Sequence, residues 1–154
     1  MLKRLLYSAC CLLCLVCFTA CGSPKPAATA EPPLVPQKEQ VWQLVAIRGK
    51  AVNPNAAVVT IVVNPEAATL SGQAACNPFA ASCRLALAEQ QPSGDRYTIV
   101  LSDLKAGGRQ CPEADMNAEA RFLALLPKAD ALVLTAYTLT LLQKDKEILK
   151  FELQ

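Results

Sequence analysis

The chain has 154 residues, in which 15 Lys and Arg face 13 Asp and Glu, and it contains no histidine. The absence of histidine excludes Ser-His-Asp and Cys-His catalysis and most zinc and copper sites. The near-neutral charge, without a run of basic residues, gives no electrostatic reason to expect nucleic acid as a partner.

The first 20 residues have the three-part layout of a secretory signal. Lys3 and Arg4 give a positive start, an apolar run follows to about Phe18, and small residues then lead to Cys21. The apolar run is shorter than the roughly 20 residues that a membrane-spanning helix needs. We therefore predict a signal peptide over residues 1–20, with an uncleaved N-terminal anchor as the alternative.

The end of this signal, Phe18-Thr19-Ala20-Cys21, resembles the lipobox of bacterial lipoproteins. In that motif the cysteine is acylated and becomes the first residue of the mature protein. Gly22 follows this cysteine. An Asp at that position would resemble a signal that retains a lipoprotein at the inner membrane. We expect a lipid anchor on Cys21 that holds the protein at the bacterial outer membrane, facing the periplasm.

Residues 21–40 are predicted to be a tether between this lipid and the domain. They contain five of the 11 prolines and no aromatic residue, a composition that favours extended, solvated chain. At roughly 3 Å per residue the tether would hold the domain up to about 50 Å from the membrane. The domain itself is expected over residues 41–154.

Most of the domain has the alternation and β-branched content of strands. Turn signals separate the segments, such as Asn64-Pro65 and the Lys-Asp-Lys run at 144–146. The aromatic residues of the segments are predicted to lie in the core: Trp42, Tyr97, Phe122 and Phe151. The predicted strands fall within residues 41–49, 56–63, 68–75, 83–89, 96–104, 131–143 and 147–154.

One segment, at about 113–126, has helical spacing of its apolar residues. Pro112 suits the first turn and Pro127 should end the helix at Leu126. Strands and helices do not alternate as they do in a parallel sheet. We therefore predict an α+β, mostly β fold, in which a curved antiparallel sheet or partly open barrel of about seven or eight short strands packs with the helix.

The cysteines are the remaining candidates for chemistry. Cys76, Cys83 and Cys111 do not have the Cys-x-x-Cys spacing of a redox site. Cys111 precedes the helix near Arg109, where a thiolate would be stabilised, but an exported protein usually oxidises such thiols. Three thiols permit at most one intramolecular disulfide, and the spacing leaves its partners open. Asn77-Pro78 is interpreted as a turn.

Several motifs together resemble a known family. They are Trp42-Gln-Leu near the domain start, the Gly-x-x-x-Cys-Asn-x-Phe run from Gly72 to Phe79, and a cysteine before a Glu-x-x-Phe helix at Glu119 and Phe122. A hairpin closes the chain. This order is similar to the META domain, or HslJ-like, family of bacterial envelope lipoproteins, and the resemblance covers about residues 41–153.

The resemblance implies a small β-rich domain with one helix, no established catalytic activity, and an association with envelope stress and drug tolerance. It implies that Cys76 and Cys111 are the recurring pair, which leaves Cys83 unpaired or as an alternative partner. It also marks Asn77 as a motif residue. The chain departs from the family pattern at Ala75, often Gly, at Arg109-Gln110, and at the extra Cys83.

We therefore expect a non-enzymatic lipoprotein that binds an unknown protein or small molecule, with no catalytic residue, metal or cofactor. One alternative is an inhibitor of a cell-wall or host hydrolase, acting through an exposed loop at 89–96 or 143–147. A less favoured alternative is a thiol-dependent enzyme that uses Cys111.

Overall fold

The computed structural model describes residues 32–154. The predicted signal peptide, the lipobox with Cys21 and the first part of the tether lie outside the described residues. Within the described part of the chain, no helix is long and apolar enough to cross a membrane.

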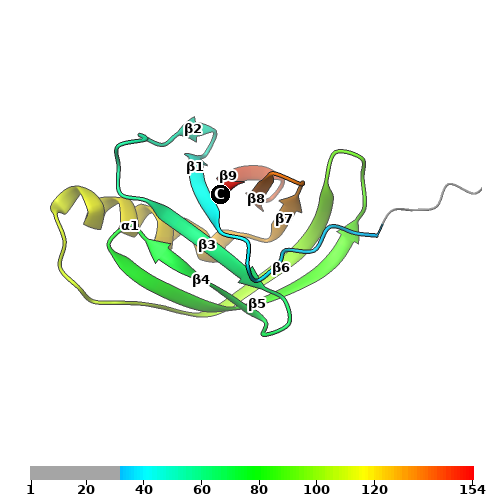
Figure 1. The fold of residues 1–154 in the computed structure, drawn as a ribbon, viewed down its shortest axis with the longest axis horizontal. Helices are drawn as coiled ribbons and strands as arrows, with labels where there is room; N and C mark the ends of the chain where they lie inside the picture. Colours follow the sequence, from blue (N-terminus) through cyan, green and yellow to red (C-terminus); the bar gives the residue numbers. More distant parts are fainter. Residues whose placement is uncertain (1–31) are drawn as a thin grey trace, which may run out of the picture. The chain divides into compact units, whose positions relative to one another are not determined.

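The strands form one antiparallel sheet that closes on itself (Figure 1). Strand β1 pairs with β3 on one side and with β9 on the other, where Trp42 lies opposite Leu153. An eight-stranded barrel results, to which the two-residue strand β2 is added at the end of β1. The strands are β1 (Trp42–Ile47), β2 (Lys50–Ala51), β3 (Val59–Asn64), β4 (Thr69–Ala74), β5 (Asn77–Glu89), β6 (Asp95–Ala106), β7 (Ala131–Leu134), β8 (Thr138–Gln143) and β9 (Lys146–Leu153).

The alternation in the sequence explains the barrel core. In β3, Val59, Ile61 and Val63 are buried while the residues between them are only partly covered. Successive side chains of a strand point to opposite faces, so every second residue of β3 enters the interior. The four aromatic residues predicted for the core are all buried. The mostly β, antiparallel prediction is confirmed, and the barrel is closed rather than partly open.

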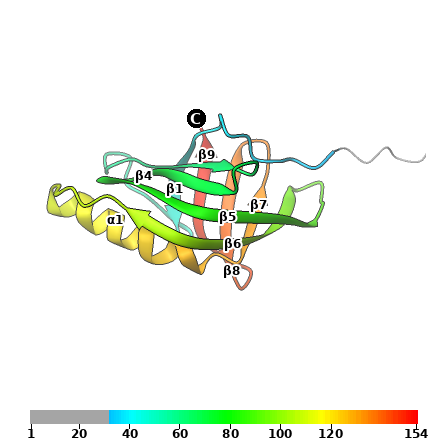
Figure 2. The ribbon, with the colours of Figure 1, turned by 90° about the horizontal axis from the view of Figure 1, so that it is seen from below.

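Helix α1 (Glu113–Leu125) follows Pro112, and a short 3-10 helix, η1 (Leu126–Lys128), continues from it. The α-helix ends one residue before the predicted Leu126, and Pro127 lies within the 3-10 turn. Phe122 is fully buried on the face of α1 that contacts the barrel. Figure 2 shows α1 beside the barrel, with β5 and β6 crossing in front of β8 and β9.

The hairpin of β5 and β6 is much longer than the others, and its tip extends away from the barrel (Figure 1). Residues 89–93 at this tip are exposed. The turn between β8 and β9 is tight by comparison, because Lys144 and Asp145 both have positive φ. Arg96 and Asp145 form an ion pair at 2.5 Å near this turn.

Residues 32–40 precede β1, and part of this segment lies against the barrel. Leu34 donates its backbone N–H to the Asp95 carboxylate and accepts a hydrogen bond from the Tyr97 hydroxyl. Pro36 is buried. Burial and then the nearby Asp95 carboxylate raise the pKa of Tyr97. Within the described residues these hydrogen bonds begin at Leu34, so part of the stretch predicted to be a tether, residues 21–40, belongs to the domain.

Candidate functional site

The residues singled out in the sequence meet where β4 turns into β5. The turn is formed by Ala75 and Cys76, and Asn77 is already the first residue of β5. The interpretation of Asn77-Pro78 as the turn is therefore wrong. Ala75 adopts φ of +65°, a left-handed conformation that glycine tolerates better than alanine.

Cys76 forms a disulfide with Cys111, and the two Cα atoms are 5.9 Å apart. The bond joins the β4–β5 turn to the residue before Pro112, where α1 begins, across a sequence separation of 35. Cys83 is a free thiol in the core of the barrel. Burial raises its pKa to about 11, so its reactive thiolate form is disfavoured at neutral pH.

Asn77 and Glu119 form a buried polar pair beside the disulfide. The Glu119 carboxylate accepts the Asn77 backbone N–H at 2.7 Å and its side-chain amide at 3.1 Å. Only 1% of Asn77 and 7% of Glu119 are exposed. Because few waters reach them, the two residues satisfy each other's hydrogen-bonding groups.

Arg109 completes this arrangement from the loop before α1. Its backbone N–H donates to the Asn77 Oδ1 at 2.8 Å, and its carbonyl accepts from the Asn77 Nδ2 at 3.1 Å. The Arg109 guanidinium donates to the Cys76 carbonyl at 2.5 Å. We call the five residues the clamp: Cys76, Asn77, Arg109, Cys111 and Glu119.

Two glycines let backbones approach closely near the clamp. A Cβ added to Gly72 would lie 2.0 Å from the Thr60 carbonyl oxygen on the neighbouring strand β3. A Cβ added to Gly107 would lie 2.9 Å from the Asn77 Oδ1. Gly72 therefore serves the pairing of β3 with β4, and Gly107 serves the approach of the loop to Asn77.

Three aromatic rings connect the clamp region to the barrel core. Phe79 and Phe122 pack edge to face with centroids 5.2 Å apart, and Phe122 and Phe151 do so at 6.5 Å. This geometry is favourable for aromatic pairs. Phe79 and Phe122 therefore anchor α1 to β5, which places Glu119, one helical turn before Phe122, over Asn77.

The sulfur, amide and carboxylate groups of the clamp are bonded to other groups of the protein. Both of its sulfur atoms are in the disulfide, and the Asn77 amide and Glu119 carboxylate bond to protein groups. Among the described residues, no group of three or more Cys, Asp or Glu side chains could hold a metal ion. Glu113 and Asp115, the two acidic residues of the first turn of α1, lie apart from the clamp on the helix.

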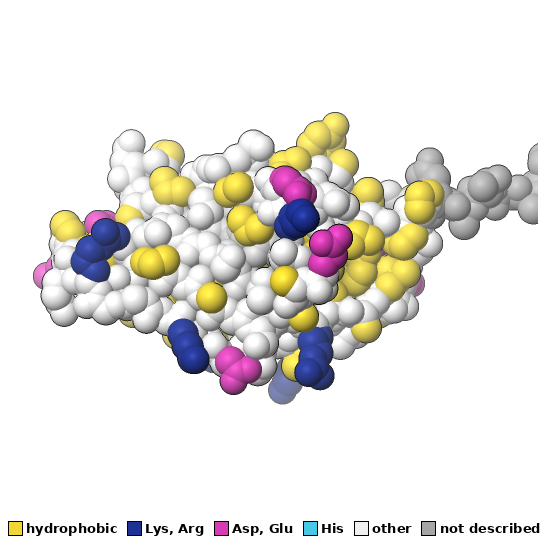
Figure 3. Space-filling view, turned by 60° about the horizontal axis from the view of Figure 1, so that its bottom comes forward, with side chains coloured by type: hydrophobic (Ala, Val, Ile, Leu, Met, Phe, Trp, Pro, Cys, Tyr) yellow, Lys and Arg dark blue, Asp and Glu magenta, His cyan; other side chains and the backbone are white. Residues whose placement is uncertain are grey.

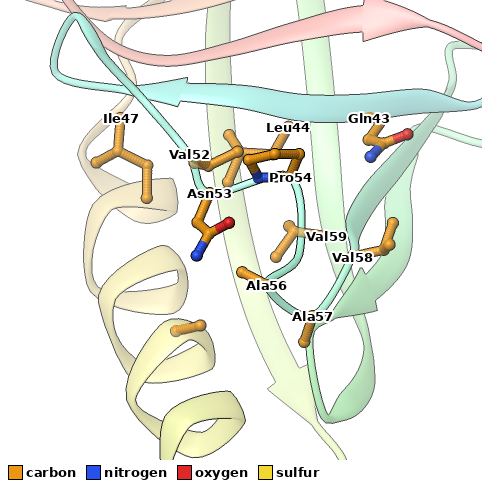
Figure 4. Close-up of a pocket in the computed structure, with 11 residues that line it drawn as sticks. Gln43, Leu44, Ile47, Val52, Asn53, Pro54, Ala56, Ala57, Val58 and Val59 are labelled. Carbon is orange, nitrogen blue, oxygen red and sulfur yellow. The ribbon is translucent and has the colours of Figure 1, made fainter.

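The described surface also has a small pocket of about 70 Å³ between β1, the loop before β3 and α1 (Figure 4). Its lining is mostly aliphatic, with Val52, Pro54 and Val58 around it and the amide of Asn53 at its edge. Ligand sites for drug-sized molecules have volumes of about 300–1,000 Å³. The pocket is large enough for one side chain of a partner, but it is too small for a cofactor.

Two site features were missed in the sequence. The sequence predicts no partner for Arg109 beyond Cys111, whereas the Arg109 backbone binds the Asn77 side chain. Asp95 lies within the expected exposed loop at 89–96, but it is the first residue of β6, is 4% exposed and accepts the Leu34 backbone N–H. The Gly-Arg run before Cys111 could have suggested a tight backbone approach, but no local signal indicated the partner of Asp95.

The comparisons with known proteins agree with this architecture. Two solved NMR structures have similar folds, one of them of a protein from Burkholderia xenovorans, at 17% identity and a TM-score of 0.55 over 85% of this chain and 96% of that one. The other has 19% identity and a TM-score of 0.50, over 75% of this chain and 90% of its own. No curated protein matches significantly. The family model of the META domain matches residues 35–154, so the chain belongs to the META domain family.

Proposed function

We propose that this protein is a non-catalytic lipoprotein of the bacterial envelope that acts as an accessory or binding module. The observation that carries the proposal is the lipobox at Phe18-Thr19-Ala20-Cys21, followed by proline-rich chain and then an ordered domain. The lipid on Cys21 would hold the domain at the periplasmic face of the outer membrane. A role in envelope stress or drug tolerance would be the context of its binding.

The states of Cys111 and Cys83 support a role that does not use a cysteine nucleophile. Cys111, the candidate nucleophile of the sequence, has its sulfur bonded to Cys76. The other described thiol, Cys83, is buried and its pKa is raised to about 11. A nucleophilic thiol needs a lowered pKa and access to a substrate, and neither cysteine meets both conditions. A disulfide also suits an exported domain.

Fractionation of bacteria that express the full chain tests the lipid anchor. We expect the parent protein in the membrane fraction. The Cys21→Ala variant should either be in the soluble fraction or keep its signal peptide, because the acylated residue is gone. Cys83→Ala is the matched control, since it also removes a thiol but leaves the lipobox intact. A Cys21→Ala variant that still partitions wholly with membranes as a processed protein would overturn the anchor.

The long β5–β6 hairpin favours a second candidate function, inhibition of a cell-wall or host hydrolase. Its exposed tip extends from the barrel, as a loop that enters a partner's cleft would. The other candidate loop, at 143–147, contains only a tight turn. We expect Ser93→Arg at the hairpin tip to abolish inhibition of a sensitive hydrolase and Lys146→Glu to preserve it. If purified protein inhibits none of a panel of muramidases, amidases and peptidases, this candidate is wrong.

A further inference from the structure

The end of the barrel that receives the N-terminal segment carries four of the six exposed large hydrophobic side chains of the described residues. We call these four the apolar patch: Leu34, Val35, Leu87 and Tyr137, which are 42%, 44%, 47% and 77% exposed. Figure 3 shows hydrophobic side chains gathered on the side where the described chain begins. A cluster of this kind marks an interaction surface more often than scattered single residues do.

Pairing and hydrogen bonds place these residues at the same end. The Leu34 backbone forms hydrogen bonds with the Tyr97 and Asp95 side chains, and Leu87 lies opposite Tyr97 in the β5–β6 pair. Tyr137 is in the turn after β7, whose last residue pairs with Asp95. The Tyr137 carbonyl also accepts the backbone N–H of Leu153, at the end of β9.

The composition of the preceding chain does not favour a cover for the patch. Residues 22–31 read Gly-Ser-Pro-Lys-Pro-Ala-Ala-Thr-Ala-Glu and contain no large apolar side chain. They therefore offer little apolar area to bury against four such side chains, and burial of apolar area is what would stabilise the contact. The twelve residues between Cys21 and Leu34, at roughly 3 Å each, also limit the distance from Cys21 to the domain to about 36 Å.

We infer that the apolar patch rests on the bilayer surface to which Cys21 is attached. The inference rests on the proposed lipid anchor, because the short tether then brings this end of the barrel to the membrane. Tyr137 has the amphipathic ring that is enriched at the membrane–water boundary, and the three aliphatic side chains can enter the boundary beside it. The patch would orient the domain and turn the opposite end, with the pocket at Val58, toward the periplasm.

The charges near the patch suit a zwitterionic surface. Lys38 lies 3.9 Å from Glu39 and 3.8 Å from Glu66, so the basic side chain is already balanced by acidic neighbours. Asp95 is buried beneath Leu34. The contact should therefore come from apolar burial and should persist at high salt, which weakens contacts between exposed charges.

Quenching of tryptophan by brominated lipid tests this orientation. The full chain, purified in acylated form from bacterial membranes, is placed in vesicles of phosphatidylcholine with or without bromine on the acyl chains. Tyr137→Trp puts a reporter in the patch. Val58→Trp is the matched control, because Val58 is 48% exposed and precedes β3, whose six residues separate it from the patch end by about 20 Å. Trp42 gives the same buried background in both variants.

We expect brominated lipid to quench the added fluorescence of Tyr137→Trp at least about twofold more than that of Val58→Trp, at low and at high salt. Equal quenching of the two variants in vesicle-bound protein would overturn the inference and leave the anchor standing; the patch would then face another protein or a second copy. Protein that fails to float with the vesicles would overturn the anchor and the inference together.

Discussion

Replacement of Glu119 probes the clamp most sharply. Glu119→Ala removes the acceptor of two hydrogen bonds, from the Asn77 backbone and from its side-chain amide. Hydrogen bonds to a charged group contribute about 1.5–3 kcal/mol each, and a buried donor left without a partner costs a similar amount. Because only 1% of Asn77 is exposed, water cannot easily replace the carboxylate. We expect Glu119→Ala to lower the free energy of unfolding by about 3–4 kcal/mol.

Glu119→Gln provides a graded comparison. Its amide retains one acceptor oxygen but turns an NH₂ group toward the second Asn77 donor, so about half of the loss, roughly 2 kcal/mol, is expected. Glu113→Ala is the control, since Glu113 is exposed on the first turn of the same helix and its interaction with the helix dipole contributes about 0.3–1 kcal/mol.

Urea unfolding of the oxidised full chain, followed by circular dichroism, measures the three losses. The predicted order of stability is parent, Glu113→Ala, Glu119→Gln and then Glu119→Ala. If Glu119→Ala costs no more than Glu113→Ala, the clamp does not depend on this carboxylate and the reasoning from burial is wrong. Unfolding temperatures should follow the same order, by about 3–5 °C per kcal/mol for a domain of this size.

Three further predictions concern the turn and the cysteines. Cys76→Ser with Cys111→Ser should lower stability by about 4 kcal/mol in the chain-entropy estimate, and an unchanged urea midpoint would contradict this. Ala75→Gly relieves the left-handed strain at φ +65° and should stabilise by about 0.5 kcal/mol, whereas Ala74→Gly in the adjoining strand should destabilise; equal effects would refute the strain. Burial raises the pKa of the Cys83 thiol from 9.0 to about 11. Between pH 9 and 11 this thiol is therefore protonated in the folded state and ionised in the unfolded state, so stability is lost as pH rises through this range. At pH 10.5 the parent should lose about 2 kcal/mol more than Cys83→Ala, relative to pH 7.5, and parallel pH profiles would contradict this.

The strands and the helix were largely predictable because their signals are local. The alternating buried positions Val59, Ile61 and Val63 are visible in the sequence, and so are the helical spacing around Phe122 and the proline that ends the helix. Closure of the barrel was not predictable in this way. It depends on the pairing of Trp42 with Leu153, at opposite ends of the domain, and no local pattern encodes such a partner.

The same distinction explains the errors at the site. Asn-Pro is a turn signal in isolation, but the Asn77 side chain is held by Glu119 and Arg109, which are 42 and 32 residues away in the sequence. The proline-rich composition before β1 indicated a solvated tether, yet the Leu34 backbone forms hydrogen bonds with the Asp95 and Tyr97 side chains on the barrel. Long-range hydrogen bonds decided the structure in both places.

Mass spectrometry of the N-terminal peptide tests the central claim, a lipid-anchored META domain, most directly. The protein is purified from membranes of bacteria that express the full chain and is digested without removal of its lipids. The account predicts a mature chain that begins at Cys21 and carries acyl groups on that residue. A mature chain that begins elsewhere, or an N-terminal Cys21 without acyl groups, would contradict it.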